Sequence, residues 1–424
     1  MGSLFRNREF VALSATAFAR SQAYSTVLIA LALYADLFGT TGFVEGLFGT
    51  SFALAQLLIV LPLGRAIDTG NAKRFLLGGL AVNVAVFVAF VFVQNPVDVI
   101  LLRIVQGVGA SVLWLTGSAV VGEISPGDSM GRWFGFYNQV GAFSSLAGDV
   151  VGGYLLFAYG FTWTYLVLSA ITIGAGLLVF VFLRDSPGGQ ADPAAATGVE
   201  RLRSLLDRRL IQSLVAFRLA FSIGKMSVII FLPIYARTAF GVSALGIGGI
   251  LAGGKLTKAL LQGWMGELTD RVGHKPWFVA GGALLYALGT AAIPLASVVQ
   301  DAVPTVRLSA LGHTLVVTGA VLTLFLAYSV LGVADSLRLP ASMALFVEEG
   351  ERFDSVASSM SLRSISWKVG QVVGPALVGV IKDTLSTLLA FWTAAGFVLL
   401  ATMVFVVVYA RENVSETLFT APGD

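Results

Sequence analysis

Hydrophobic and polar positions alternate along this chain in long blocks, and apolar runs of about 20 residues or more are separated by short polar stretches. A helix that crosses the hydrocarbon core of a bilayer needs about 20 predominantly apolar residues. The pattern therefore predicts an all-α membrane protein with 12 transmembrane helices. The expected spans are residues 9–38, 42–64, 74–94, 97–122, 131–158, 161–183, 210–236, 243–265, 277–298, 314–347, 354–381 and 386–410. The tenth is too long for one straight span, and its outer part could instead be a loop.

Basic residues lie predominantly on one side of these spans. If the N-terminus is inside, fifteen lie in inner segments and three, Arg237, Arg307 and Lys382, lie in outer loops. Cytoplasmic loops carry the excess of Lys and Arg in membrane proteins. Both termini are therefore expected in the cytoplasm, and the protein is expected to be a multi-pass protein of the plasma membrane.

Composition supports this class and excludes several others. Of 424 residues, 56% are hydrophobic and 12% are charged, about half the charged fraction of soluble domains. The absence of cysteine excludes disulfides and thiolate metal sites, and two histidines are too few for a metal cluster. The bases are spread along the chain rather than gathered in a patch for nucleic acid. We expect no metal and no cofactor, and a monomer in contact with membrane lipids.

A linker rich in Pro, Gly and Ala follows the sixth span. It divides the chain into an N-terminal six-helix bundle (1–184), a cytoplasmic linker (185–209) and a C-terminal six-helix bundle (210–424). Residues 199–210 of this region predict a short amphipathic helix whose arginines could bind anionic lipid headgroups. A plain solvated connector is the alternative.

The two halves repeat each other. Residues 266–276 (GELTDRVGHKP) form a polar stretch between two apolar runs, and residues 64–74 (GRAIDTGNAKR) echo it in the first half. Residues 123–153 can also be aligned with residues 349–379 without a gap, which places Gly148 on Gly374. Transporters built from parallel six-span halves show such weak internal symmetry. The repeat predicts two pseudo-symmetric bundles.

Several motifs together resemble those of the major facilitator superfamily. Residues 266–276 match its signature loop almost position for position, whereas the copy at 64–74 is shorter by one residue and has Thr69 in place of a base. Residues 101–110 (LLRIVQGVGA) are similar to a motif of proton-coupled members. Residues 148–153 (GDVVGG) are similar to an element of the drug:proton antiporter branch, with Asp149 replacing its proline.

The resemblance implies alternating access between the two bundles, with Asp68 and Asp270 as latches of the inner gate. Anchoring of the loops to the inner leaflet by Arg and Lys is the alternative. The candidate gating residues are Asp68, Lys73, Arg74, Gly266, Asp270, Arg271, Gly273 and Lys275.

Basic residues inside the apolar runs are unusually frequent. There are nine of them, and each costs about 2.5–3.5 kcal/mol at a helix centre. Deep acids are few, namely Asp149 and Asp335, so pairing cannot neutralise this interior. An anionic substrate is therefore predicted, a carboxylate, phosphate or sulfate. The candidate substrate-binding residues are Lys225, Lys255, Lys258, Arg20, Arg338 and Trp367.

A simpler explanation of these bases is also open. Arg218 and Arg363 could extend towards the cytoplasm. Asp335 and Arg338 could form a local pair at helical spacing.

Proton coupling needs a buried carboxylate whose proton comes and goes as its surroundings change. Asp149 is the best candidate, Asp36 and Arg103 lie at compatible depths, and Asp335 is a further candidate. We expect Arg103 to pair with Asp36 or Asp149, and one of these acids to carry the proton. A purely structural brace is the alternative for Arg103.

Taken together, the sequence predicts a proton-coupled secondary active transporter for a small organic, anionic molecule. No Gly-x-x-x-x-Gly-Lys-Ser/Thr loop is present for ATP, and no nucleophile and base with a recognisable spacing suggests an enzyme. The Gly-rich element of span five favours export, whereas the basic interior favours an anion:proton uptake symporter. A channel or a non-transporting receptor is a further alternative.

Overall fold

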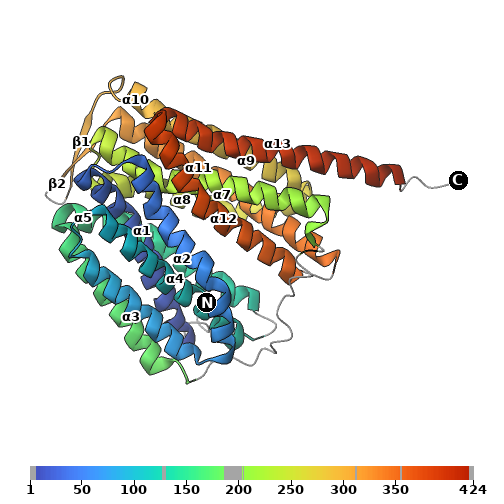
Figure 1. The fold of residues 1–424 in the computed structure, drawn as a ribbon, viewed down its shortest axis with the longest axis horizontal. Helices are drawn as coiled ribbons and strands as arrows, with labels where there is room; N and C mark the ends of the chain where they lie inside the picture. Colours follow the sequence, from blue (N-terminus) through green and yellow to red (C-terminus); the bar gives the residue numbers. More distant parts are fainter. Residues whose placement is uncertain are drawn as a thin grey trace. The chain divides into compact units, whose positions relative to one another are not determined.

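The computed structural model describes residues 6–126, 130–185, 203, 205–310, 313–353 and 356–419. The helices and strands, shown in Figure 1, are α1 (Arg8–Phe38), α2 (Gly42–Thr69), α3 (Ala72–Phe90), α4 (Pro96–Ile124), α5 (Met130–Phe182), α7 (Arg209–Phe240), α8 (Ala244–Val272), α9 (Lys275–Ala292), the 3₁₀ turn η2 (Ile293–Leu295), α10 (Ala296–Val299), β1 (Val306–Ala310), β2 (His313–Val317), α11 (Gly319–Glu351), α12 (Val356–Thr384) and α13 (Thr387–Phe419). The prediction of an all-helical membrane protein is confirmed in its main features.

In the part of the chain that the structure describes, eleven helices are long and apolar enough to cross a membrane. One of them, α5, has 53 residues. At about 1.5 Å per residue it is far longer than a bilayer core of about 30 Å. Gly160, with φ 72° and ψ −170°, interrupts this helix and divides it into two segments across a kink. The predicted spans 131–158 and 161–183 lie on the two sides of Gly160.

The outer part of the tenth predicted span is not helical. Residues Val306–Ala310 and His313–Val317 pair as an antiparallel hairpin, and α11 begins only at Gly319. The Thr318 side chain accepts a hydrogen bond from the backbone N–H of Val321 at 3.3 Å and so caps this helix. The outer part of the predicted span 314–347 is therefore not helix, as the loop alternative allowed, although it forms a strand rather than a loop. A β-branched stretch and a capping threonine precede the first helical turn.

The two polar stretches of the repeat are mostly helix rather than loop. Helix α8 continues to Val272, Gly273 takes a left-handed conformation at φ 73°, and α9 begins at Lys275. In the first half α2 continues to Thr69, and the Asn71 side chain accepts from the Arg74 N–H at 3.3 Å to cap α3. Each turn is therefore two residues long, and Asp270 lies in the last turn of α8. The side chain of Asp68 lies outside the described part.

The predicted linker, 185–209, lies mostly outside the described residues, as does the start of the amphipathic helix expected at 199–210. Within the described part, Leu205 is buried and packs against Ile211 and Leu362. This leucine therefore faces the protein rather than lipid.

The chain forms two compact units. Unit 1 contains Met1–Ala194, Pro233–Ala252 and Thr305–Val317, and unit 2 contains Ala195–Leu232, Gly253–Pro304 and Thr318–Asp424. In unit 1, α1 packs against α4 and α5, and α3 packs against the same two helices. In unit 2, α9 packs against α11 and α13, and α12 packs against the same two.

Helix crossings within each unit repeat as the sequence alignment predicts. A Cβ at Gly148 of α5 would collide with the backbone of Gln22 in α1, and a Cβ at Gly374 of α12 would lie 2.6 Å from Ile223 O in α7. Small residues let membrane helices approach this closely. Gly148 and Gly374 are the positions that the gap-free alignment places together.

A second crossing repeats in the same way. A Cβ at Gly107 of α4 would lie 2.5 Å from Phe52 O in α2, and one at Gly332 of α11 would collide with Gly254 O in α8. The two units therefore share one packing scheme, and residues can be matched between them by counting from these glycines.

Gly332→Ala is expected to lower the stability of the folded protein by about 1–3 kcal/mol, because the added methyl group has no room between α8 and α11. The melting temperature of the purified protein measures this. Gly396→Ala is the matched control, since a Cβ there has no atom within 4 Å. Equal melting temperatures for the two variants would show that this crossing is not tightly packed.

Candidate functional site

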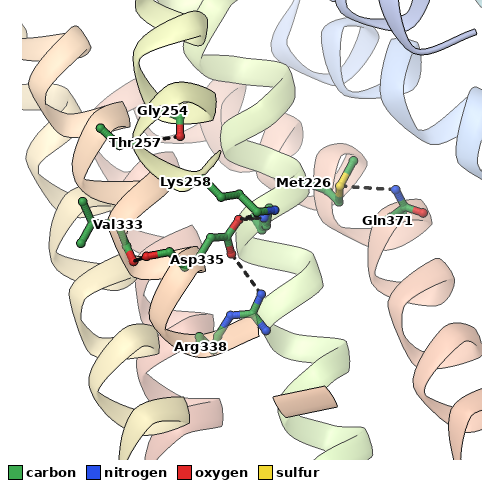
Figure 2. Close-up of polar contacts among 10 residues, drawn as sticks. Met226, Gly254, Thr257, Lys258, Val333, Asp335, Arg338 and Gln371 are labelled. Carbon is green, nitrogen blue, oxygen red and sulfur yellow. Dashed lines mark hydrogen bonds and ion pairs between the residues drawn. The ribbon is translucent and has the colours of Figure 1, made fainter. Parts of the chain in front are cut away.

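Three basic side chains of unit 2 converge on one buried carboxylate, Asp335 of α11. Lys225 of α7 donates to Asp335 Oδ2, and Lys258 Nζ of α8 lies 3.8 Å from the same oxygen. Arg338, one helical turn further along α11, donates from Nη2 to Asp335 Oδ1 at 3.0 Å. Figure 2 shows Asp335 with Lys258 on one side and Arg338 on the other. The site thus joins three helices through a single acid.

Aromatic faces hold the arginines around this acid. Arg338 lies over the Phe221 ring at 3.7 Å, and Arg218 of α7 lies over the Trp367 ring at 4.1 Å. Arg218 and Arg338 are 7% and 1% exposed, respectively. Arg363 of α12 interacts electrostatically with both. Guanidinium groups suit such stacking because they are planar and weakly hydrated.

Several donors of these arginines are unused. Buried nitrogens of Arg218 (Nε and Nη1), Arg338 (Nε and Nη1) and Arg363 (Nε) have no hydrogen-bond partner among the described residues. An unmet buried donor costs about 1–3 kcal/mol, and more when it is charged. The arrangement is therefore suited to accept oxygens from a further anion.

We call the six residues the Asp335 cluster: Asp335, Lys225, Lys258, Arg338, Arg218 and Arg363. It has five basic side chains and one acid, so positive charge remains in excess after every pairing in it. A desolvated surplus of this kind attracts anions and repels cations.

The structure places the other predicted substrate residues as follows. Trp367 is half-buried against Arg218, and its ring lies 5.9 Å from Lys225 Nζ. Lys255 is half-buried in α8. Arg20 belongs to unit 1, where it lies over the Trp114 ring at 4.5 Å. Lys225, Lys258, Arg338 and Trp367 thus belong to one site within unit 2.

The predicted pairing of Arg103 with Asp36 is not formed. Arg103 is 1% exposed, donates from Nε to Phe48 O at 2.9 Å and from Nη1 to Gln106 Oε1 at 2.7 Å. Its guanidinium also stacks over the Phe52 ring at 4.1 Å. The hydrogen bond to Phe48 O joins α4 to α2 through Arg103, and the proton-coupling role expected for this arginine stays a prediction.

Asp36 has a different partner. Its carboxylate accepts from Arg237 Nε at 2.8 Å, and both residues belong to unit 1. Arg237 lies in the last turn of α7 rather than in an outer loop. Asp149 is fully buried in α5, and its role in proton coupling stays a prediction.

The gating candidates lie at helix ends. Lys275 pairs with Glu348 of α11, and Arg271 pairs with Glu267 at 2.5 Å. Asp270 and Gly273 are exposed, and Asp270 makes no ion pair within the described part of the chain. Gly266 lies in α8, and in the first half Lys73 Nζ lies 3.3 Å from Asp185 while Arg74 is exposed in α3. Their gating role stays a prediction.

Comparison with protein families decides the identity. The family model described as Major Facilitator Superfamily matches residues 13–303 and 214–423, and so nearly the whole chain. The chain belongs to the major facilitator superfamily. This confirms the resemblance seen in the motifs.

Relatives within the superfamily are transporters. An uncharacterised MFS-type transporter of Methanocaldococcus jannaschii is 21% identical over 84% of this chain and 86% of that one. The multidrug resistance protein MdtG of Salmonella choleraesuis is 25% identical over 90% of each chain. The expectation that this chain is not an enzyme is thereby confirmed.

Solved structures agree on the fold of the superfamily. A bacterial homologue of the human lysosomal transporter Spinster has a TM-score of 0.71 at 15% identity, covering 96% of both chains. The nucleoside transporter NupG has a TM-score of 0.74 at 14% identity, covering 95% of this chain and 100% of that one. A peptide transporter in complex with sulfate has a TM-score of 0.73 at 14% identity, covering 96% and 95%. These identities show the fold alone.

Sequence reasoning missed part of the site that this superfamily member carries. Arg218 and Arg363 were candidates for extension towards the cytoplasm, yet Arg218 is buried on Trp367. The pairing of Lys225 with Asp335 joins residues far apart in sequence and has no local signal. The Arg237–Asp36 pair was missed for the same reason.

Proposed function

We propose that this protein is a proton-coupled secondary active transporter for a small organic anion, with export as the favoured direction. The observation that carries the proposal is the Asp335 cluster. Its five bases outnumber its one acid, and three of its arginines keep unused buried donors.

The charge of the substrate follows from the energetics of this cluster. A buried charge is tolerated when it is paired and hydrogen-bonded. Arg218 and Arg363 have no carboxylate partner among the described residues, so a carboxylate, phosphate or sulfate group on the substrate would supply one. Planar guanidinium groups bind such groups through two parallel hydrogen bonds.

The transport cycle we propose is alternating access between residues 1–184 and residues 210–424. The protein would have twelve spans, cytoplasmic termini and a plasma-membrane location. Its driving force would be the proton gradient, and it would need no cofactor. Export is favoured because relatives of this chain bear the name multidrug resistance protein. Uptake by anion:proton symport is the second candidate, since Asp335 lies directly among the bases that would hold the anion.

Transport by purified protein in vesicles tests the proposal. A carboxylate, a phosphate ester and a sulfate ester are compared with a neutral sugar and a lipophilic cation, under pH gradients of either sign. We expect flux of at least one anion, driven by the gradient and lost in Arg218→Gln. Arg209→Gln, at an exposed position of α7, is the matched control and is expected to retain flux. Flux of the cation alone, or flux independent of pH, would contradict the proposal.

The role of Asp36 can be separated from that of its ion pair. Asp36→Asn and Arg237→Gln both break the same contact, whose side chains are 40% and 31% exposed. Exposed pairs contribute about 0–1 kcal/mol, so neither variant is expected to change the melting temperature much. If Asp36 carries the proton, Asp36→Asn loses pH-driven flux and Arg237→Gln keeps it. Equal losses would show that only the contact matters.

A further inference from the structure

We propose that Asp335 is an internal competitor of the transported anion: the anion takes Lys225 and Lys258 from the Asp335 carboxylate, and this carboxylate binds a proton in the same step. The inference rests on the anion site proposed above. It assigns the coupling proton to a residue of that same site.

The two oxygens of Asp335 are held differently. Oδ1 accepts from Arg338 on the same helix, and this contact can persist whenever α11 is intact. Oδ2 is held by lysines from two other helices, Lys225 of α7 and Lys258 of α8. The Lys258 contact is the looser one, at 3.8 Å and with a side chain 32% exposed. An incoming anion would therefore meet Lys258 first and then compete for Lys225.

Other charged and titratable groups surround this carboxylate. Arg218 of α7 and Tyr286 of α9 both interact with it electrostatically. Arg363 of α12 interacts with Arg338 and Arg218 rather than directly with the acid. None of these groups is a second carboxylate, so within the described residues Asp335 is the acid available to take up a proton here.

Protonation of Asp335 follows from placing a second anion, the substrate, next to its carboxylate. An anion that binds Lys225 and Lys258 has its oxygens close to Oδ2, because the same two ammonium groups now bind it. Sulfate brings two negative charges next to a carboxylate that then keeps the Arg338 hydrogen bond but loses both lysines, and this repulsion together with the lost contacts favours the protonated acid. A sulfate ester or sulfate ion resists protonation, so the proton binds to Asp335. The O–H bond forms at Oδ2 as a proton leaves hydronium or a buffer acid in the solvent, whose own bond to that proton breaks and whose conjugate base stays in solution.

The two ligands therefore favour each other at this site. A proton on Asp335 frees the lysines for the anion, and the anion in turn draws a proton to Asp335, as linkage requires. Proton and anion would then cross together, so this inference favours the second candidate named above, anion:proton symport, over export by antiport.

The charged residues of the cluster have neutral counterparts in unit 1 at four matched positions. Counting from the crossing glycines and from the residues they contact pairs Lys225 with Tyr24, Lys258 with Gln56, Asp335 with Ala110, and Arg338 with Leu113. At these four positions unit 1 therefore shares the packing but has neither the acid nor the bases.

Calorimetric titration of the full-length protein with sodium sulfate tests the inference, in two buffers that differ in ionisation heat. Sulfate keeps its charge throughout the neutral range, so any pH dependence belongs to the protein. We expect close to one proton taken up per sulfate bound, and an affinity that falls by up to about tenfold per pH unit. Asp335→Asn is expected to bind sulfate more tightly, without proton uptake and without pH dependence.

Asp301→Asn is the matched control, because this acid of unit 2 is exposed, and it should behave as the wild type does. Should Asp335→Asn fail to fold, the infrared band of a protonated carboxyl group can be followed in the wild type, and it should grow when sulfate is added. Sulfate binding without proton uptake would overturn the inference about Asp335 but would still support the proposed anion site. No sulfate binding by the wild type at any pH would overturn both.

Discussion

Lys225→Met is expected to destabilise the folded protein by about 1.5–3 kcal/mol. The reason is that Lys225 is the lysine in direct contact with Asp335, whose side chain is only 6% exposed. Asp335 keeps Arg338 and the more distant Lys258, so the loss is that of one hydrogen bond to a charged group rather than that of an unpaired buried charge. Thermal unfolding of the purified protein measures the loss.

A double-mutant cycle with Asp335→Asn separates pairing from packing. Lys225→Met is expected to cost less stability in the Asp335→Asn protein than in the wild type, since the asparagine side chain no longer needs a charged partner. Asp335→Asn itself also leaves Arg338 and Lys258 without their carboxylate, so only the difference between the two costs measures the pair. Anion transport should be absent from Lys225→Met and from the double variant. If Lys225→Met costs as much in both backgrounds, the lysine contributes through its packing rather than through the ion pair.

Arg103→Lys is expected to cost about 2–4 kcal/mol in stability. Arg103 donates to Phe48 O and to Gln106 Oε1 while it stacks over Phe52. A lysine can replace one charged hydrogen bond but lacks the planar fork, so it loses the second bond and the stacking. The melting temperature again gives the measurement.

The control for Arg103 is Arg132→Lys, at an exposed arginine of α5, for which we expect no measurable change. An Arg103→Lys protein that is as stable as the wild type but has lost pH-driven flux would contradict a purely structural role of Arg103 between α4 and α2. It would return Arg103 to the proton-coupling role that the sequence predicted.

The helices and their repeat were predictable because a helix that spans the membrane needs a long run of apolar residues, which can be seen directly in the sequence. The apolar runs predicted most of the spans. The matched glycines of the repeat, Gly148 and Gly374, lie where two helices approach each other closely. Ends were less predictable, because helices extend past the apolar run into polar residues wherever a cap is available. Thus α8 ends at Val272 before Gly273, seven residues beyond the predicted end of its span.

The candidate site was predictable in composition but not in pairing. The cost of burying Lys225, Lys258 and Arg338 identified them as functional candidates. Their common partner could not be found, because contacts between α7, α8 and α11 depend on which helices become neighbours. The same reason explains why Asp36 was considered, with Asp149, as a partner of Arg103, whereas its partner in the structure is Arg237.

The shared packing scheme also has an evolutionary consequence. Because Gly107 and Gly332 support the same crossing in the two units, a duplicated ancestor could alter the chemistry of one copy without disturbing how its helices pack. Counted from these glycines, Ala110 and Leu113 stand where the second copy has Asp335 and Arg338, so the two copies carry different chemistry on the same helix crossing.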